Sequence, residues 1–330
     1  MKAIVYTKYG PPDVLELKEV EKPTPRDNEV LVKVHAASIN DWDWCLLQGK
    51  PFVNRLMYGL LKPKIQILGC DIAGRVEAVG RKVKQFRPGD EVFGDISGCG
   101  WGGFAEYVCA HENALALKSA GMTFDEAAAI PQAAMLALQG LVDRGQIRSG
   151  QKLLINGAGG GVGTFAVQIA KLYRVELTGV DSSGKLDMLR SMGFDHVIDY
   201  TQEDFTAAGS RPADRKSDQR YDLILDVKTN RPIFNYARVL RPNGTYVTVG
   251  GSMARLFQAL LLGPWISMTR KKNIRIVALK PNKDLVYMNE LFEAGKVIPV
   301  IDRRYPLSEV PEAFRYYGEG HARGKVVITM

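Results

Sequence analysis

A glycine-rich turn in the middle of the chain has the residue types and spacing that bind a dinucleotide. The apolar run Lys152 to Asn156 is followed by seven residues of which five are glycine, and Thr164 to Leu172 then has the pattern of a helix. Glycines there permit a tight turn, close approach of the backbone to a pyrophosphate, and close packing of helix on strand. The helix N-terminus adds unpaired N–H groups and a positive dipole end. The pattern predicts a dinucleotide site, with a purely structural turn as the alternative. The expected phosphate-contacting residues are Gly157, Ala158, Gly159, Gly160, Gly161 and Val162.

Further along the chain, two strand ends carry residues that suit the rest of such a site. The predicted strand Val175 to Val180 ends at Asp181 and Ser182. A carboxylate there accepts hydrogen bonds from an adenosine ribose diol and repels a 2′-phosphate, which favours NAD. The alternative role for Asp181 is the N-cap of the helix that starts at Ser183. Gly250 closes a later strand at the carboxyl edge of the sheet, a position that commonly lines the cofactor cleft.

Alternating strands and helices position this turn. After about Thr123 the chain changes to an Ala- and Leu-rich helix over 125–140, which Pro131 should break or kink. Two βαβαβ halves follow in succession, which is the signature of a doubly wound sheet. The predicted strands are 152–155, 175–180, 197–200, 223–227, 245–250 and 274–279, and the last helix before the sixth strand is 252–262. We therefore predict a dinucleotide-binding domain over 125–281, with a polar surface loop from Asp204 to Arg220 between its halves.

The remainder of the chain is β-rich. Residues 1–124 hold short alternating or β-branched runs separated by Pro and Gly clusters, which predicts a small, partly open barrel. The tail, 282–330, has a Val-rich strand near Val297, a helix around Val310 and a final strand from Lys325 to Thr329. We expect this last strand to pair back onto the N-terminal domain. The fold class is α/β, with a β-rich substrate domain and a doubly wound domain.

Composition sets limits on the class of protein. The chain has 330 residues, 46% hydrophobic and 24% charged, which suits two globular domains. Its net charge is +8, but Lys and Arg are scattered and no basic run is interleaved with aromatics, so we expect no nucleic-acid partner. No signal peptide is apparent, and the longest apolar region, Leu256 to Met268, is interrupted and too short to span a bilayer. The four cysteines show no paired spacing, which favours free thiols and a cytoplasmic location.

At this point the whole chain resembles the medium-chain dehydrogenase/reductase superfamily, specifically its zinc-independent, quinone oxidoreductase-like branch. The matching segments are spread over the full length. They are Met1 to Val5, Ser38 to Asp43, Leu68 to Gly74, Phe86 to Gly94, Gly102 to Tyr107, the glycine turn, and Gly324 to Ile328. The resemblance implies a GroES-like substrate domain, a Rossmann domain, and an active site in the cleft between them.

The resemblance also implies catalytic residues. Asn40 is similar in place to the Asn of the quinone reductase motif, where an amide bonds both a substrate carbonyl and the nicotinamide region. A loop-turning asparagine is the alternative. Asp43, in the same motif, orients Asn40 or a neighbouring backbone group. Tyr58 is a candidate proton donor, although a tyrosine packed at the cleft edge is the favoured interpretation.

Cofactor choice follows from the same comparison. In NADPH-using members, a basic residue and a tyrosine at positions similar to Lys185 and Tyr200 hold the 2′-phosphate. The alternative for Lys185 is an exposed charge on a helix face. The family favours NADPH, while Asp181 leaves NAD open. Lys325 is expected to approach the cofactor from the tail, with a strand-edge charge as the simpler interpretation.

Two positions depart from the family pattern. Gly159 stands where relatives often have Ser, and Leu136 where they often have a Thr facing the nicotinamide.

The residues at the zinc-ligand positions of the family indicate whether this chain binds zinc. The zinc enzymes of this superfamily carry Cys, His and Cys ligands at three places, which Asn40, Cys70 and the neighbourhood of Gln132 occupy here. Only one soft ligand remains, whereas a catalytic zinc needs three protein ligands. We therefore expect no metal.

Without a metal to polarise a carbonyl, the chemistry that needs least help is hydride delivery to an already electron-poor carbon. We expect an NAD(P)H-dependent reductase of quinones or α,β-unsaturated carbonyls. The family resemblance also implies a homodimer formed by edge pairing of the strand Ile274 to Leu279. The alternatives are an alcohol dehydrogenase and a non-catalytic NAD(P)H-binding protein at a membrane surface. The +8 charge and the Leu256 to Trp265 apolar patch keep the latter open, with membrane contact at most peripheral.

Overall fold

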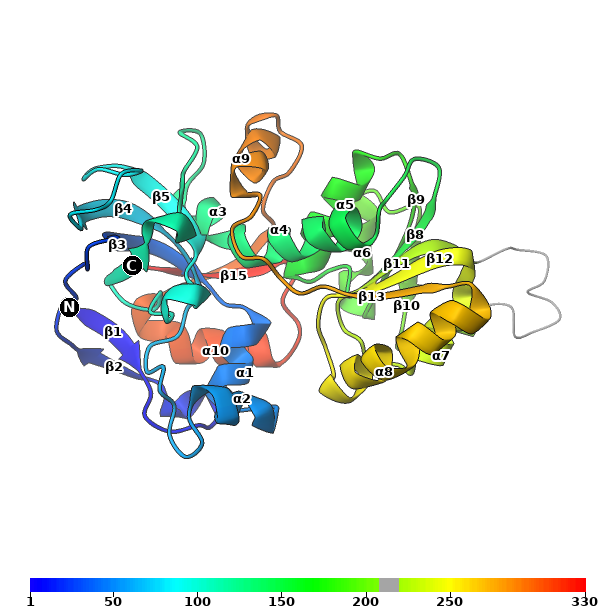
Figure 1. Cartoon of the computed structure of the whole chain (residues 1–330), viewed down its shortest axis with the longest axis horizontal. Coiled ribbons are helices and arrows are strands. Elements are labelled where there is room, and N and C mark those ends of the chain that lie inside the picture. Colours follow the sequence, from blue (N-terminus) through cyan, green and yellow to red (C-terminus); the bar gives the residue numbers. More distant parts are fainter. Residues whose placement is uncertain (208–219) are drawn as a thin grey trace. The chain divides into compact units, whose positions relative to one another are not determined.

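The computed structural model describes residues 1–207 and 220–330 (Figure 1). These residues form two compact units, 1–135 with 280–330, and 136–279. The predicted loop Asp204 to Arg220 lies mostly outside the described residues. No helix in the described ranges is long and apolar enough to cross a membrane.

The first unit is built on a seven-stranded sheet in the order β14-β15-β3-β4-β5-β7, with β6 also paired to β3. These strands are β3 (Glu29–Ser38), β4 (Asp71–Val79), β5 (Glu91–Asp95), β6 (Tyr107–His111), β7 (Ala116–Leu117), β14 (Ile301–Pro306) and β15 (Lys325–Thr329). A separate antiparallel pair is formed by β1 (Lys2–Val5) and β2 (Glu16–Glu19). The helices of this unit are α1 (Asp41–Gln48), α2 (Phe52–Tyr58), α3 (Phe124–Ala129), α9 (Leu285–Glu293) and α10 (Val310–Gly318). The unit is the predicted β-rich domain with its return segment.

The return segment positions a key side chain. The final strand pairs back onto the N-terminal domain, as the sequence predicted: β15 is antiparallel to β3, and Val327 lies opposite Ser38. This pairing brings Lys325, at the start of β15, beside the chain that leads from β3 into α1. The strand predicted near Val297 is wrong, because the strand of this region begins at Ile301.

The boundary between the units falls after 135, whereas the sequence placed it after 124. The reason is packing: α3 contacts β3, β4 and β15 of the first unit. Pro131 does interrupt the helical stretch, since α3 ends at Ala129 and α4 (Pro131–Leu138) begins at the proline. A π-helical turn, Gln139–Arg144, completes this stretch.

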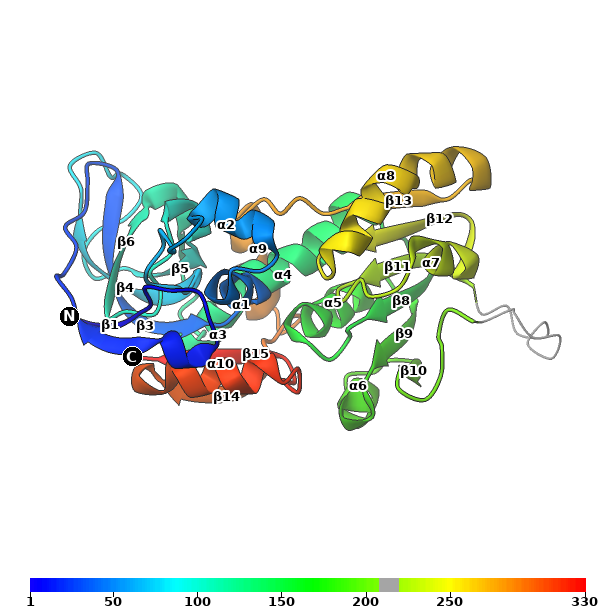
Figure 2. The same ribbon diagram turned by 90° about the horizontal axis from the view of Figure 1, so that it is seen from below.

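The second unit holds a six-stranded parallel sheet in the order β10-β9-β8-β11-β12-β13. Its strands are β8 (Lys152–Asn156), β9 (Glu176–Asp181), β10 (His196–Asp199), β11 (Tyr221–Asp226), β12 (Leu240–Thr248) and β13 (Asn273–Ile276). One face of the sheet carries α5 (Gly161–Lys171) and α6 (Leu186–Ser191), and the other carries α7 (Ile233–Val239) and α8 (Met253–Arg270) (Figure 2). This order and these crossovers confirm the doubly wound fold.

The sixth βα unit differs in length from its prediction. The helix expected over 252–262 continues through Gly263 and Pro264 to Arg270, and β13 is shorter than the strand expected over 274–279. A Cβ on Gly263 would come within 3.1 Å of the Ile274 side chain, so the glycine lets α8 pack closely on β13.

Candidate functional site

The glycine turn forms as the sequence predicted, and backbone hydrogen bonds fix its path. The N–H groups of Gly157 and Ala158 both donate to the carbonyl oxygen of Val180, at 3.0 and 3.2 Å. Gly157 has a φ of +83°, which favours glycine. A Cβ on Gly163 would lie 2.4 Å from the carbonyl oxygens of both Gly157 and Ala158. The turn therefore requires glycine at its first and last positions.

The first turn of α5 offers donors to an anion. Its N-cap is Gly160, which has no side chain to cap the helix. Within the described part of the chain, no group accepts a hydrogen bond from the backbone N–H of Gly161, Val162 or Gly163. A Cβ on Gly160 would meet only one atom, at 3.7 Å, so the backbone here is open to a ligand. Free N–H groups at the positive end of a helix dipole suit a pyrophosphate.

Asp181 points into the turn. Its carboxylate accepts hydrogen bonds from the N–H of Gly159 at 2.8 Å and of Ser182 at 2.9 Å. The N-cap alternative for Asp181 is wrong, because Ser182 is the residue that precedes the 3₁₀ turn Ser183–Lys185 leading into α6. Both oxygens of the carboxylate are thus engaged by the backbone of the site.

Lys185 lies beside the same carboxylate. Its Nζ is 3.7 Å from Asp181 Oδ1, and only 8% of its side chain is exposed. The alternative of an exposed helix-face charge is therefore wrong. A Cβ on Gly159 would lie 2.8 Å from Lys185 Cδ. The lysine fills the space into which a side chain at position 159 would project, which gives a physical reason for glycine at this position.

Other predicted contacts line the same edge of the sheet. Tyr200 is 44% exposed and its N–H donates to the Asp181 carbonyl. Next to it, Asp199 accepts hydrogen bonds from Ser183 and Thr201, which lower the pKa of its carboxyl. Gly250 follows β12, where its carbonyl accepts from Thr248 Oγ1 at 3.1 Å. The parallel register brings the ends of β8, β9 and β12 to the carboxyl edge, where doubly wound sheets bind ligands.

A second cluster is buried in the first unit, around Lys325. The Nζ of Lys325 donates to Asn40 Oδ1 at 2.5 Å and to the Ile39 carbonyl at 3.3 Å, and lies 3.5 Å from Asp71 Oδ2. Asn40 Nδ2 in turn donates to Asp71 Oδ2 at 2.9 Å and to Cys70 Sγ at 3.3 Å. All five residues are buried. The lysine and the aspartate together fix the orientation of the Asn40 amide.

Asp43 accepts hydrogen bonds from two backbone N–H groups next to this cluster. Its Oδ2 accepts from the N–H of Asn40 at 3.0 Å, and its Oδ1 accepts from the N–H of Gly69 at 3.0 Å. The start of α1 and the segment before β4 are thereby joined. Asp43 contacts the backbone on either side of the candidate site, which is the supporting role that the sequence allowed.

Burial perturbs every acid of the cluster. Desolvation raises the pKa of Asp43 to about 7, against the lowering effect of hydrogen bonds from Gly69 and Asn40. Desolvation likewise raises the pKa of Asp71 to about 6, although Lys325 opposes the rise. The pKa of Asp95 and that of the Cys70 thiol are also raised by burial. The cluster therefore retains protons at pH values where exposed carboxyls have lost them.

The three positions weighed for zinc do come together. Gln132 Nε2 lies 3.5 Å from Cys70 Sγ, and Asn40 Nδ2 lies 3.3 Å from the same sulfur. Ligand atoms of Cys70, Asp71 and Asp95 also lie within 4.8 Å of one another, and one carboxylate oxygen of Asp95 is buried with no hydrogen-bond partner in the described part of the chain. However, the ammonium of Lys325 already contacts Asn40 Oδ1 and Asp71 Oδ2, so a cation is already present beside these groups. An amide, a thiol, an amide and a lysine do not make the donor set of a catalytic zinc.

Tyr58 stands apart from this cluster. At the end of α2, its ring meets Trp101 edge-on with centroids 5.5 Å apart, and Trp101 meets Trp42 in the same way at 5.1 Å. Burial raises the pKa of the Tyr58 hydroxyl, which makes it a weaker proton donor. Among the described residues, no hydrogen bond joins Tyr58 to Asn40, Asp43 or Lys325. Its catalytic role stays a prediction, and its contacts are those of a packed aromatic.

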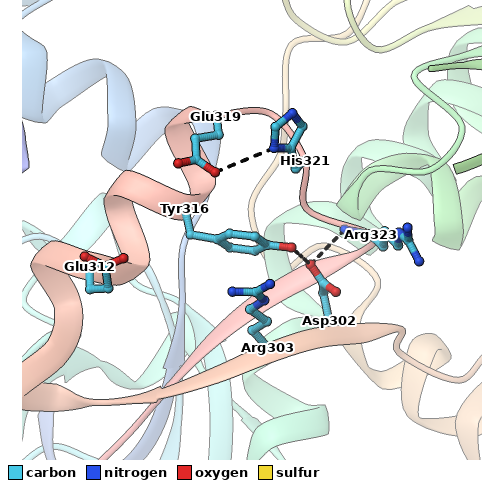
Figure 3. Close-up of a pocket in the computed structure, with 7 residues that line it drawn as sticks. All are labelled: Asp302, Arg303, Glu312, Tyr316, Glu319, His321 and Arg323. Carbon is cyan, nitrogen blue, oxygen red and sulfur yellow. Dashed lines mark hydrogen bonds and ion pairs between the residues drawn. The ribbon is translucent and has the colours of Figure 1, made fainter. Parts of the chain in front are cut away.

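A polar pocket of about 600 Å³ lies on the surface of the first unit (Figure 3). Its charged groups already pair with one another: Tyr316 donates to Asp302 at 2.5 Å, and His321 lies 3.6 Å from Glu319. The guanidinium of Arg303 lies 3.9 Å from the centre of the Tyr316 ring. No predicted site residue lines this pocket, so it is a poor candidate for the cofactor or the substrate.

Sequence reasoning missed several members of both sites. Asp71 appeared only within a family motif, Asp95 and Ser38 were not singled out, and Asp199 was read as part of a strand. Ser38 Oγ donates to Asp71 at 3.3 Å, and Asp95 accepts the N–H of Ser97. Asp71 stands at the start of β4 between the apolar residues Cys70 and Ile72, and an acid in such a position was the available signal, because a buried carboxylate needs partners.

Known proteins resemble the chain over its full length. Residues 26–120 match the family described as alcohol dehydrogenase GroES-like domain, and residues 192–328 match the family described as zinc-binding dehydrogenase. A chloroplast envelope quinone oxidoreductase homolog from Arabidopsis thaliana is 32% identical over 99% of this chain and 98% of its own. An NADPH-dependent alkenal/one oxidoreductase from the chloroplast of the same plant is 32% identical over 99% of this chain and 79% of its own. The solved structure of a quinone oxidoreductase from Coxiella burnetii superposes with a TM-score of 0.88 at 29% identity, over 100% of this chain and 99% of its own.

Proposed function

Because the chain belongs to the quinone oxidoreductase-like branch of the medium-chain dehydrogenase/reductase superfamily, it is an oxidoreductase, and we propose that it reduces quinones or α,β-unsaturated carbonyls with NAD(P)H. A reduced nicotinamide supplies the hydride when it is bound. The single observation that carries the proposal is the open N-terminus of α5, where three N–H groups have no acceptor among the described residues and no side chain caps the helix. The relatives named above are a quinone oxidoreductase homolog and an alkenal/one oxidoreductase, which supports this substrate class.

The residues proposed to hold the cofactor are those at the carboxyl edge of the parallel sheet. Gly157 to Val162 contact the pyrophosphate, and Gly250 lines the neighbouring strand end. Ser182, Lys185 and Tyr200 are proposed to surround the adenosine ribose. Lys325, which lies in the first unit, stays a predicted cofactor contact.

NADPH is the proposed form. Asp181 uses its two oxygens for the N–H groups of Gly159 and Ser182, so it does not present a free carboxylate to the ribose diol. Lys185 supplies a cation at the same place. Asp199 opposes this preference, because its lowered pKa keeps it ionised near Ser183.

In the first unit, Asn40 is proposed to bind the oxygen of the substrate. Its Oδ1 is held by Lys325, but one amide hydrogen points only at Cys70 Sγ, 3.3 Å away. Sulfur is a weak acceptor, so a carbonyl oxygen competes for this hydrogen at little cost. Lys325 and Asp71 keep the amide in that orientation, and Asp43 keeps the backbone of Asn40 in place.

The reaction is proposed to need no metal, because the donor set around Cys70 contains one thiol and two amides at the three ligand positions. Elemental analysis of the purified protein tests this directly. Zinc at one equivalent per chain, together with oxidation of ethanol by NAD, would instead identify an alcohol dehydrogenase.

The function is tested by steady-state turnover of a quinone and an enone with NADPH and with NADH. We expect turnover with both substrates and a lower KM for NADPH.

Asp181→Ala separates two roles of this carboxylate. A large loss of affinity for both cofactors indicates that it supports the glycine turn, whereas a gain of affinity for NADPH alone indicates that it discriminates against the 2′-phosphate. Tight NADPH binding without turnover of any quinone or enone would contradict the proposed activity and favour a non-catalytic binding protein. A cytoplasmic location is part of the proposal, and cell fractionation tests it.

A further inference from the structure

The outer face of α8 is an exposed apolar surface with unusual uniformity. Every exposed residue from Ala254 to Met268 is apolar. The large ones are Phe257 at 54% exposure, Leu260 at 58%, Leu261 at 73%, Trp265 at 50% and Met268 at 85%. The opposite face, with Ala259, Gly263 and Ile266, packs towards β13. We call the exposed set the α8 apolar face.

This face is continuous along the helix. Its members recur at intervals of three and four residues, which places them on one side of an α-helix. From Phe257 to Met268 the face is about 16 Å long at the rise of an α-helix. In Figure 1, α8 lies at the outer side of its unit, beside β13 and α7. Apolar patches of this kind mark a binding surface for a protein or a membrane.

Charge decides between these two occupants. From Val227 to Lys283 the sequence contains 11 Lys and Arg residues and no Asp or Glu. The rest of the chain has 33 basic and 36 acidic residues, so the whole positive charge of the protein comes from this segment. Lys and Arg are spread along the whole chain, but the segment around α8 contains no Asp or Glu to balance them. This segment is therefore strongly basic.

The cations at the two ends of the α8 apolar face are available. Arg255 lies just before Phe257, the first large side chain of the face, and Arg270 and Lys271 follow Met268, the last one. In the described part of the chain, no carboxylate pairs with any of the three: Arg255 contacts Gln258, and Arg270 lies over the ring of Phe234. An apolar stripe with cations at its ends, in a segment of the sequence that contains no Asp or Glu, is the pattern of a helix that lies in the headgroup region of an anionic membrane.

We propose that the α8 apolar face docks on the surface of an anionic phospholipid bilayer, with the helix lying parallel to the membrane plane. Phe257, Leu261 and Met268 enter the boundary between headgroups and acyl chains, and Arg255, Arg270 and Lys271 contact lipid phosphates. Such docking brings the protein to the phase in which apolar quinones and enones are concentrated. It is independent of turnover, because α8 contributes no residue to either candidate site.

The experiment is co-sedimentation of the full-length protein with vesicles of phosphatidylcholine and with vesicles that also contain phosphatidylglycerol. We expect binding to the anionic vesicles, weakened by salt, and at least about tenfold weaker binding for Leu261→Gln, since the variant no longer buries the apolar surface of the leucine in the membrane. Val286→Gln is the matched control, because Val286 is an aliphatic residue 65% exposed on α9. It should bind as the parent does, and both variants should retain NADPH-dependent turnover.

A spectroscopic readout separates docking from general stickiness. Trp265 is the only one of the four tryptophans that lies on α8, and the other three are Trp42, Trp44 and Trp101. Anionic vesicles should shift the tryptophan emission to the blue, and Trp265→Phe should abolish the shift. Equal binding to neutral and anionic vesicles, or no binding at all, would overturn the proposal. So would a Leu261→Gln variant whose only defect, by light scattering, is the loss of a dimer, since the face would then cover a second copy of the chain.

Discussion

At the scale of single residues, one lysine balances several buried acids. Lys325 Nζ lies 3.5 Å from Asp71 Oδ2, and its charge opposes the burial-driven rise in the pKa of Asp43, Asp71 and Asp95. A buried ion pair contributes little net stability over an apolar pair, but breaking it leaves an unpaired buried charge. Lys325 is therefore a structural cation of the first unit as well as a proposed contact of the site.

Replacement of this lysine tests the pairing. Lys325→Met should lower the free energy of unfolding by about 3–5 kcal/mol, because Asp71 then lacks a cation. Asp71→Asn combined with Lys325→Met should regain a large part of this loss, because the carboxylate closest to the lysine is then neutral as well. The measurement is urea denaturation of the two single variants and the double variant. Additive effects of the two substitutions would show that Lys325 and Asp71 do not interact.

The raised pKa of Asp43 gives stability a pH dependence. The folded protein keeps its carboxyl protonated up to about pH 7, whereas the unfolded chain loses that proton near the ordinary value of 3.8. The folded state thus binds more protons between these values, so the free energy of unfolding falls as the pH rises from about 4 through 7. Asp71, with a pKa of about 6, adds to the fall at lower pH. The loss from Asp43 is at most about 4 kcal/mol for a shift of about three units.

Urea midpoints between pH 5 and pH 8 measure this effect, with Asp43→Asn as the comparison. The variant should show a flatter dependence on pH, since the titrating group is gone. An equally steep dependence in Asp43→Asn would assign the titration to other groups.

At the scale of elements, the turn between β8 and α5 depends on the absence of a side chain at one end. A Cβ on Gly163 would lie 2.4 Å from two backbone carbonyl oxygens, which cannot move without opening the turn. Gly163→Ala should therefore lower the melting temperature by several degrees, the expected scale for about 1–3 kcal/mol of overpacking. It should also weaken NADPH binding by more than tenfold, because the N–H groups of α5 are displaced.

Gly160→Ala is the control for this prediction. A Cβ there meets a single atom at 3.7 Å, and the φ of −89° suits any residue. Its melting temperature should equal that of the parent in a circular dichroism melt. A stable Gly163→Ala variant with unchanged NADPH affinity would show that the close approach is not required.

The turn could be predicted from sequence because every contact that defines it is local or joins neighbouring strands. The Lys325 cluster could not, since Lys325 and Asn40 are 285 residues apart and meet only through the pairing of β15 with β3. The family resemblance pointed to Lys325 and Asn40 as site residues. It did not predict that they contact each other, or that Asp71 contacts both of them. The length of α8 was underestimated because Gly263 and Pro264 usually end a helix, and packing of Gly263 on Ile274 outweighs that tendency here.

At the scale of the whole molecule, the edge strand β13 is the place where a second copy of the chain could extend the six-stranded sheet. It is the last strand of the six-stranded sheet, paired on one side only with β12 among the described residues. An unpaired edge strand is a template for pairing with another chain unless it is blocked by charge, proline or a covering element. The proposed homodimer uses this edge, which would join two sheets into one.

A proline on β13 tests that dimer without unfolding the sheet. Val277 N–H donates to the Thr248 carbonyl in β12, so by strand alternation the N–H of Ile276 points away from β12 to the open edge. Ile276→Pro removes that outward donor and keeps the bonds to β12, as proline does on natural edge strands. We expect the parent protein to have the mass of a dimer by light scattering and the variant to have that of a monomer, with the parallel-sheet signal in circular dichroism retained. A parent protein that is monomeric at micromolar concentration would remove the basis for the dimer, and a variant that stays dimeric would place the contact on another surface.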